Sequence, residues 1–185
     1  IKIEHMKPTL LVLAAGMGSR YGGLKQMDGL GPAGETIIDY SIYDAVGAGF
    51  GRVVYIVREY FRDQMEAHVK EKYAGVKCLD GTPLDFAFVT QELDKIPAGF
   101  TLNPERQKPW GTAHATLMAK DGIDGPFVGI NGDDFYGRHA FKAMADYLNT
   151  LSLEKDKNLL GVNSLSLAMG EYGQILSISS NMAVH

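Results

Sequence analysis

The sequence predicts an α/β fold, a mostly parallel sheet with helices on both faces. Short apolar or β-branched runs alternate with segments of helical periodicity along the chain. This alternation predicts right-handed crossovers between parallel strands. A Gly-rich turn, a glutamine and an acidic pair follow the first, third and fourth predicted strands. Because parallel sheets bind ligands beyond the carboxyl ends of their strands, these three features are expected at one edge.

The first strand is expected at residues 9–14, a continuous apolar run typical of a strand buried on both faces. A helix follows from Thr36, with apolar residues at helical spacing up to Gly49. Residues 52–57 form the second strand, and the second helix places Phe61, Met65, His68 and Val69 on one face. The later elements are expected as a strand at 84–90, a helix at 112–120, a strand at 126–131, a helix at 139–148, and short strands at 158–163 and 174–179.

Composition indicates a single ordered globular domain. The chain has 185 residues, of which 45% are hydrophobic and 22% charged, and its net charge is -4. This charge argues against a broad nucleic-acid or anionic-lipid interface, which needs clustered Lys and Arg. No apolar run approaches the ~18 residues that span a bilayer, and the single cysteine, Cys78, has no intrachain partner. A reducing, cytoplasmic setting is expected, with no nucleic-acid or membrane partner.

The Gly-rich turn covers residues 13–26. Gly16 and Gly18 let backbone amides turn inward around phosphate, and Arg20 and Lys25 add charge that matches triphosphate oxygens. Two glycines after a strand also suit a plain tight turn, and the two cations favour phosphate. A dinucleotide fingerprint needs glycine where Tyr21 stands, and a Walker A loop needs Ser or Thr after its lysine, so both are disfavoured.

The acidic turn, residues 131–137, contains Asp133 and Asp134. Carboxylates are hard oxygen ligands, and Mg²⁺ at phosphoryl-transfer sites is held by one or two of them plus substrate phosphate. The alternative is an Asp-rich turn that opens the helix at His139. The shared edge with the Gly-rich turn favours the metal.

A third feature is the segment 110–115 together with Gln91. Small residues at a helix start, Gly111 and Thr112, allow a base or ribose to lie close to the backbone, although Thr112 alone also suits an N-cap. The amide of Gln91 suits hydrogen bonding to a base edge, and solvated surface is its alternative.

Taken in order, these motifs resemble the sugar-phosphate nucleotidyltransferases, a nucleotidyltransferase family. The resemblance covers residues 7–148 and rests on LAAGMGSR followed by Lys25, then ETIIDYSIYDAVGAGFGRVVYIV, WGTAHA and NGDDFYG. It implies a Rossmann-like fold of the nucleotide-diphospho-sugar transferase type. It also implies that Lys25 contacts the reacting phosphates, that Asp133 binds Mg²⁺, and that Asp134 is a second choice of metal ligand. The nucleotide-binding residues that it implies are Ala14, Ala15, Gly16, Gly18, Ser19 and Arg20 around the triphosphate, and Gln91, Gly111 and Thr112 at the base and ribose.

Two departures from the family concern the acceptor. The spacing from Arg20 to Lys25 is shorter than in most sugar nucleotidyltransferases and is similar to that of molybdenum-cofactor nucleotidyltransferases. Family members also continue well beyond 185 residues, and their second metal-binding aspartate lies in that later region. We therefore expect a nucleotide-binding domain at residues 6–150 and the start of an acceptor-binding region, apparently incomplete, at residues 151–185.

The expected reaction transfers an NMP unit from an NTP to a sugar 1-phosphate-like acceptor, with release of pyrophosphate and with Mg²⁺ as cofactor. Its partners are then the NTP and a small phosphorylated acceptor. Alternatives are a molybdopterin or phosphocholine-type acceptor, a nucleotide-binding regulatory module without catalysis and, more distantly, a dehydrogenase. The sequence does not name the base, and it leaves homo-oligomerisation open.

Overall fold

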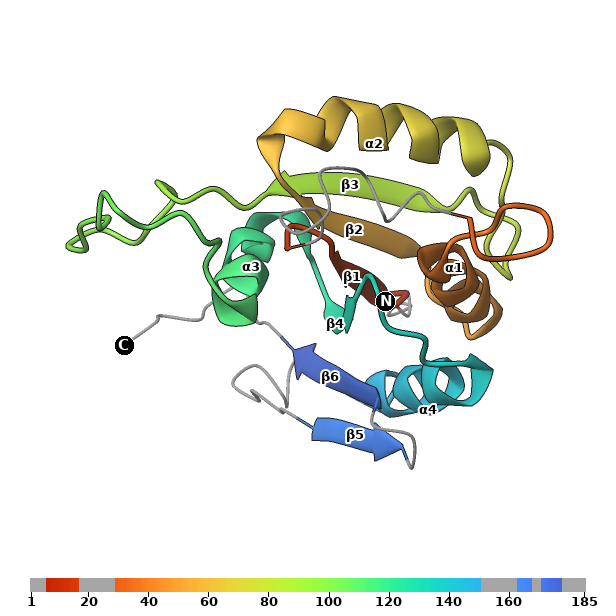
Figure 1. The fold of residues 1–185 in the computed structure, drawn as a ribbon. Helices are drawn as coiled ribbons and strands as arrows, with labels where there is room; N and C mark the ends of the chain where they lie inside the picture. Colours follow the sequence, from red (N-terminus) through yellow and green to blue (C-terminus); the bar gives the residue numbers. More distant parts are fainter. Residues whose placement is uncertain (1–5, 17–28, 151–162, 168–170, 178–185) are drawn as a thin grey trace.

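The fold is an α/β sandwich around one six-stranded sheet (Figure 1). The structure is a computed structural model that describes residues 6–16 and 29–150, together with the backbone of residues 163–167 and 171–177. The strands are β1 (Thr9–Leu13), β2 (Arg52–Val57), β3 (Asp85–Thr90), β4 (Pro126–Asn131), β5 (Asn163–Leu167) and β6 (Glu171–Ser177). The helices are α1 (Ile37–Gly47), α2 (Glu59–Lys72), α3 (Thr112–Met118) and α4 (Arg138–Leu148), with a 3₁₀ turn, η2, at Lys120–Gly122.

The sheet order is β3-β2-β1-β4-β6-β5. The chain first adds β2 and β3 on one side of β1, and then crosses back to add β4 on the other side of β1. Strands β1 to β4 are parallel, whereas β6 is antiparallel to both β4 and β5. The prediction of a mostly parallel sheet with helices on both faces is confirmed. Of the strand predicted at 158–163, only Asn163 lies among the described residues, and it begins β5. The strand predicted at 174–179 corresponds to the latter part of β6.

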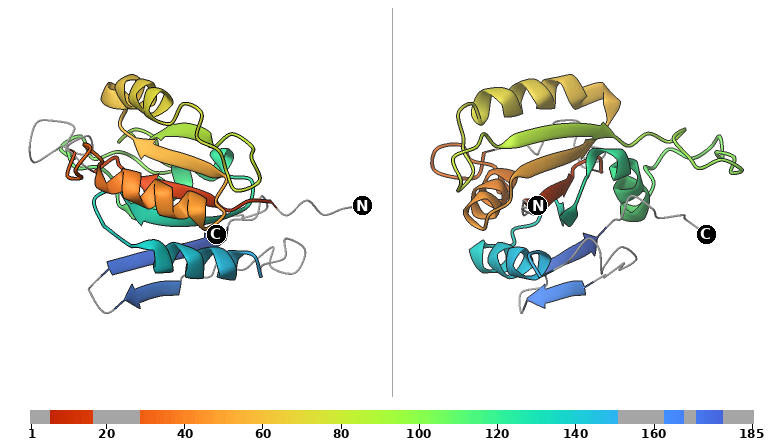
Figure 2. Two further views of the ribbon diagram at one scale, coloured as in Figure 1. Left: turned by 90° about the vertical axis from the view of Figure 1, so that its right-hand side faces the viewer. Right: turned by 180° about the vertical axis from the view of Figure 1, so that it is seen from behind.

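Two hydrophobic cores lie on opposite faces of the sheet. In β1, Leu10 and Val12 point to the core beneath α1, α2 and α4, and Leu11 points to the core beneath α3. This alternation explains the continuous apolar run, because a strand covered on both faces has no solvent side. Figure 2 shows α1 and α4 on one side of the sheet and α3 on the other.

The start of α1 is fixed by a capping box. Thr36 is the N-cap, its side chain accepts a hydrogen bond from the Asp39 N–H, and the Asp39 carboxylate accepts from the Thr36 N–H at 2.6 Å. The same carboxylate contacts Nζ of Lys72, the last residue of α2, and the hydroxyl of Tyr73, which follows it. Burial tends to raise the pKa of Asp39, but these hydrogen bonds outweigh it and hold the pKa below its ordinary value.

We therefore predict that Asp39 contributes to the acid sensitivity of folding. A group whose pKa is lowered in the folded state stabilises the protein above its unfolded pKa, here 3.8, and this stabilisation is lost as the pH falls further. In Asp39→Asn, the free energy of unfolding should be lower near neutrality and should vary less with pH. Urea denaturation at a series of pH values measures this. Asp63→Asn, an exposed site on α2, is the control, and an unaltered pH slope in Asp39→Asn would contradict the prediction.

Candidate functional site: a cavity at the strand ends

The carboxyl ends of β1 and β4 meet a cavity on the side of α3. The cavity has a volume of about 260 Å³. Its described lining residues are Leu13, Ala15, Gly16, Ile56, Gln91, Pro109, Trp110, Gly111, Thr112, Ala115, Asn131 and Asp133. The beginning of the Gly-rich turn, the glutamine, the segment after Trp110 and the acidic turn therefore converge on one space, as the order of the strands predicted.

The ends of β1 and β4 are joined directly by their backbones. The two strands pair in register from Thr9 and Phe127 to Leu13 and Asn131, and the Gly132 N–H then donates to the Leu13 carbonyl at 3.1 Å. This bond holds the start of the acidic turn next to the start of the Gly-rich turn. Gly16 is exposed, and a Cβ built on it would meet no described atom within 4 Å.

The structure places the other residues of the Gly-rich turn unequally. Ala14 is fully buried, and its N–H donates to the Ile56 carbonyl at 2.9 Å, so it supports the turn from behind the cavity wall. Ala15 lines the cavity with Gly16. The remaining predicted residues of this turn, Gly18, Ser19, Arg20 and Lys25, lie outside the described residues.

The two aspartates of the acidic turn have different environments. Asp133 is exposed and lines the cavity, and no hydrogen bond or ion pair from the described part of the chain reaches its carboxylate. Asp134 Oδ2 instead accepts hydrogen bonds from Asn131 Nδ2 at 2.8 Å and from the Tyr136 hydroxyl at 3.3 Å. Asp133 is thus the carboxylate available to a ligand, while Asp134 holds the turn together.

Tyr136 completes this arrangement. Burial raises its pKa to about 12, and the negative charge of Asp134 acts in the same direction, against a lowering effect of the Asn131 backbone bond. The hydroxyl therefore stays protonated near neutrality, so it donates to Asp134 while it accepts the Asn131 N–H at 3.0 Å. This network fixes the backbone that carries Asp133.

Gln91 is not the solvated residue that one alternative allowed. Its exposed fraction is only 3%, and its Nε2 donates to the carbonyls of Trp110 at 3.0 Å and Gly111 at 3.3 Å. The N-cap alternative for Thr112 is also wrong. Gly111 is the N-cap of α3, Thr112 is the first helical residue, and it is exposed at the cavity.

The long segment between β3 and α3 extends away from the sheet and is closed at its base (Figure 1). Trp110 Nε1 donates to the Leu93 carbonyl at 3.0 Å, and the Arg106 guanidinium lies 3.8 Å from the centroid of the Trp110 ring. The Glu92 carboxylate also accepts hydrogen bonds from Arg58 Nη2 at 2.9 Å and from the Glu59 N–H at 2.7 Å. These bonds fix the cavity wall at both ends of the segment.

Several lining residues were not predicted as site residues. Trp110 and Asn131 stand inside the two motifs that drew attention to the region, so their neighbours were the signal. Leu13 and Ala115 also lie within predicted motifs, at residues 13–26 and 110–115. Their apolar side chains, like that of Ile56, are typical of the core and do not indicate a site. Pro109 lies in the irregular segment and gave no signal of its own.

The chemistry of the donor set at this cavity is compatible with Mg²⁺. One free carboxylate at the mouth, with phosphate oxygens from a substrate, is a usual environment for this ion. Within the described ranges, no group of three His, Cys, Asp or Glu residues could hold a metal by protein ligands alone. Among the described residues, Asp133 is the carboxylate that lines this cavity and could hold such a metal together with a bound substrate.

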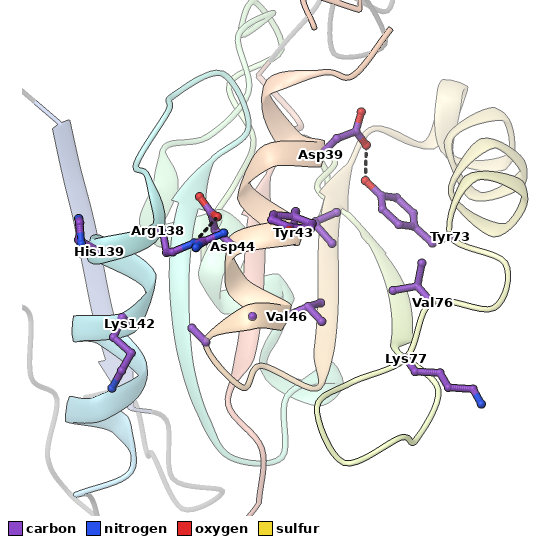
Figure 3. A pocket seen from close by; sticks show the side chains of 13 residues that line it. Asp39, Tyr43, Asp44, Val46, Tyr73, Val76, Lys77, Arg138, His139 and Lys142 are labelled. Atoms are coloured by element: carbon purple, nitrogen blue, oxygen red, sulfur yellow. Dashed lines mark hydrogen bonds and ion pairs between the residues drawn. The ribbon is translucent and has the colours of Figure 1, made fainter. Parts of the chain in front are cut away.

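A second cavity lies on the opposite face of the sheet. It has a volume of about 690 Å³ and is formed by α1, the start of α4 and the turn after α2 (Figure 3). Asp44 and Arg138 approach each other to 3.8 Å across it, and Tyr43 is exposed at its edge. Its described lining includes none of the predicted site residues, and it is separated from them by the sheet.

Comparison with known proteins gives a local sequence match and a match of the fold. No family model matches the chain. The bifunctional protein GlmU of Methanococcus vannielii is 28% identical over 102 residues, which is 55% of this chain and 22% of that protein. The match thus spans about one fifth of the relative's length.

Two solved structures share the fold over 94% of the chain. The UDP-glucose pyrophosphorylase complexed with UDP-glucose superposes with a TM-score of 0.51 at 17% identity, over 75% of that chain. The inositol-1-phosphate CTP transferase from T. maritima gives a TM-score of 0.55 at 15% identity, over 71% of that chain. Among the described residues, no helix is long and apolar enough to cross a membrane. The chain therefore shares the α/β fold of these two structures, and the resemblance to nucleotidyltransferases that its motifs predicted agrees with both matches.

Proposed function

We propose that this protein is a Mg²⁺-dependent nucleotidyltransferase that transfers NMP from an NTP to a sugar 1-phosphate-like acceptor. The observation that carries the proposal is the shared cavity of Gly16, Gln91 and Asp133 at the carboxyl ends of three parallel strands. A phosphate-binding turn, a base-binding amide and a metal-binding carboxylate are the parts that such a reaction needs. The known activities of the two proteins of similar fold, named above, agree with it.

In the proposed reaction, a phosphate oxygen of the acceptor attacks the α-phosphorus of the NTP in line with the leaving group. The bond from this phosphorus to the oxygen that bridges to the β-phosphate breaks, and pyrophosphate leaves with both electrons of that bond. Asp133 would hold Mg²⁺, which supplies charge neutralisation at the phosphates when bound. Arg20 and Lys25 would stabilise the charge on the pentavalent transition state, and no protein nucleophile is needed.

The remaining parts of the proposal concern nucleotide and acceptor. Ala15, Gly16, Gly18 and Ser19 would surround the triphosphate, with Ala14 behind them. Gln91, Gly111 and Thr112 would contact the base and ribose. Asp134 would at most be a weaker second metal ligand, since its Oδ2 already accepts two hydrogen bonds. Residues from 151 onward would contribute to an acceptor site, and a reducing cytoplasmic setting is part of the proposal.

Pyrophosphate release tests the reaction and identifies the acceptor. The protein is incubated with Mg²⁺, each of the common NTPs, and one acceptor at a time. The panel needs hexose 1-phosphates, inositol 1-phosphate, phosphocholine and molybdopterin, because the two proteins of similar fold are named for UDP-glucose and for inositol 1-phosphate, and the spacing from Arg20 to Lys25 suggests a third kind of acceptor. NTP binding without pyrophosphate release for any acceptor would replace the proposal by a regulatory nucleotide-binding module.

We predict that Lys25→Ala lowers turnover about a hundredfold, because loss of one charge contact to the reacting phosphates costs on the order of 3 kcal/mol of transition-state stabilisation. Steady-state pyrophosphate release at saturating NTP measures the effect. Lys70→Ala, which removes an exposed lysine of α2, is the matched control. Full turnover in Lys25→Ala would remove Lys25 from the site.

A further inference from the structure

A chain of hydrogen bonds connects the wall of the cavity to the segment between β3 and α3. His114 Nε2 is 2.5 Å from the Lys95 carbonyl, and His114 Nδ1 is 3.2 Å from Gln91 Nε2. Gln91 Nε2 also contacts the carbonyls of Trp110 and Gly111. His114 belongs to α3, Gln91 directly follows β3, and Gln91 lines the cavity where a nucleotide base is proposed to bind.

The partners determine the orientation of every group in this chain. The Lys95 carbonyl only accepts, so His114 Nε2 carries the proton, and His114 Nδ1 is left as an acceptor. Gln91 must then present its NH₂ group to this nitrogen. The opposite orientation of the amide would place its oxygen against the carbonyls of Trp110 and Gly111, where no hydrogen bond could form.

The amide nitrogen of Gln91 is therefore fully used by protein acceptors. It has two N–H groups and three acceptors within 3.3 Å. Since Gln91 lines the cavity, its carbonyl oxygen is the group that remains for a ligand. An amide that could rotate would accept from one base and donate to another, whereas a fixed amide oxygen requires a donor.

We propose that His114 is a positioning residue that, together with the carbonyls of Trp110 and Gly111, holds the Gln91 amide with its oxygen free for a ligand, and that this makes the site select a base with a ring N–H over one with a ring acceptor. The inference rests on the proposed function and deepens it. His114 itself touches no substrate in this account and acts only through Gln91. A base that brings an unprotonated ring nitrogen to the amide oxygen loses a hydrogen bond and places two acceptors together.

The two ring nitrogens of His114 can be tested separately by three substitutions. His114→Asn keeps an acceptor near the position of Nδ1, and His114→Gln keeps a donor near the position of Nε2. His114→Leu keeps neither. If His114 acts through Gln91, only the Asn variant retains the full base selection; if it merely anchors the segment at Lys95, the Gln variant behaves as the unmodified protein does.

The experiment measures dissociation constants for UTP and CTP, and for GTP and ATP, by calorimetry with Mg²⁺ and without acceptor. Each pair differs in the donor or acceptor at one ring nitrogen and in the exocyclic groups, so the change of the ratio between variants is the quantity that reports on Gln91. In the ring class that binds, the unmodified protein and His114→Asn should prefer the N–H base roughly tenfold, the value of one hydrogen bond. His114→Leu and His114→Gln should lower this ratio about threefold, because one acceptor of the amide is lost while the carbonyls of Trp110 and Gly111 remain.

The possible results separate the two proposals. Equal ratios in all four proteins, or a preference for the ring-acceptor base in the unmodified protein, would overturn the role of His114 and leave the nucleotide site standing. Absence of binding by any NTP would overturn the proposed function, and this inference with it. If His114→Leu fails to fold, the comparison of His114→Asn with His114→Gln decides alone.

Discussion

Asp133→Asn should abolish most of the activity while leaving the fold intact. The substitution removes, at constant size, the one carboxylate that lines the cavity in the described part of the chain. Metal-assisted charge stabilisation is worth several kcal/mol, so turnover should fall on the order of a thousandfold. Because Asp133 is exposed and no described group bonds to it, the unfolding temperature should hardly change. Pyrophosphate release over a Mg²⁺ titration, with thermal denaturation in parallel, measures both.

Two further variants make this result specific. Asp121→Asn removes an exposed carboxylate outside the cavity and is the matched control for charge. Asp134→Asn should show the opposite pattern, with a loss of stability from the bonds to Asn131 and Tyr136 and a smaller loss of turnover. If Asp134→Asn were the inactive variant and Asp133→Asn active, the assignment of the metal ligand would be reversed.

The largest loss of stability is expected for Phe141→Ala. Phe141 lies on the buried face of α4 and is fully buried, and its ring packs edge-on against Phe50 and Tyr136 at centroid distances of 6.3 and 6.2 Å. Removal of a buried phenyl ring costs about 3–5 kcal/mol, because the transfer free energy is lost and a cavity remains. Urea denaturation measures the change in unfolding free energy.

Phe100→Ala is the control, since Phe100 is 74% exposed and the same atoms are removed. Its effect should stay within about 0.5 kcal/mol, as is usual for surface positions. A cost below about 1 kcal/mol for Phe141→Ala would mean that the neighbouring side chains close over the space, contrary to the packing described here. Because Tyr136 also holds the acidic turn, Phe141→Ala should lower turnover as well.

The fold could be predicted because its information is local. The apolar run of β1, the capping threonine before α1 and the alternation of strand and helix each show within a few residues of sequence. The order of the strands and a rule for parallel sheets then placed Gly16, Gln91 and Asp133 at one edge. Small errors remained at element ends, such as α3, which ends at Met118 and is followed by η2.

The details of the site could not be predicted because they depend on contacts between distant residues. The buried Gln91 amide donates to the carbonyls of Trp110 and Gly111, which are 19 and 20 residues away. The residues next to Gln91 in the sequence therefore gave no sign of these partners. The difference between Asp133 and Asp134 arises from the tyrosine two positions further, whose hydroxyl turns back to Asp134. The role proposed for His114 depends on Lys95 and Gln91, which are 19 and 23 residues away in the sequence.

The segment between β3 and α3 is closed at its base, so the geometry of the site does not depend on how long the segment is. Its two ends are tied together at Leu93 and Trp110, so residues inserted near Phe100 enlarge a ring whose closure has already been made. The entropic cost of closing such a ring grows slowly with its length, by about 0.6 kcal/mol for each doubling. The length and sequence of this segment could therefore change in evolution, for example to bind other molecules, without disturbing the cavity wall that would hold the nucleotide.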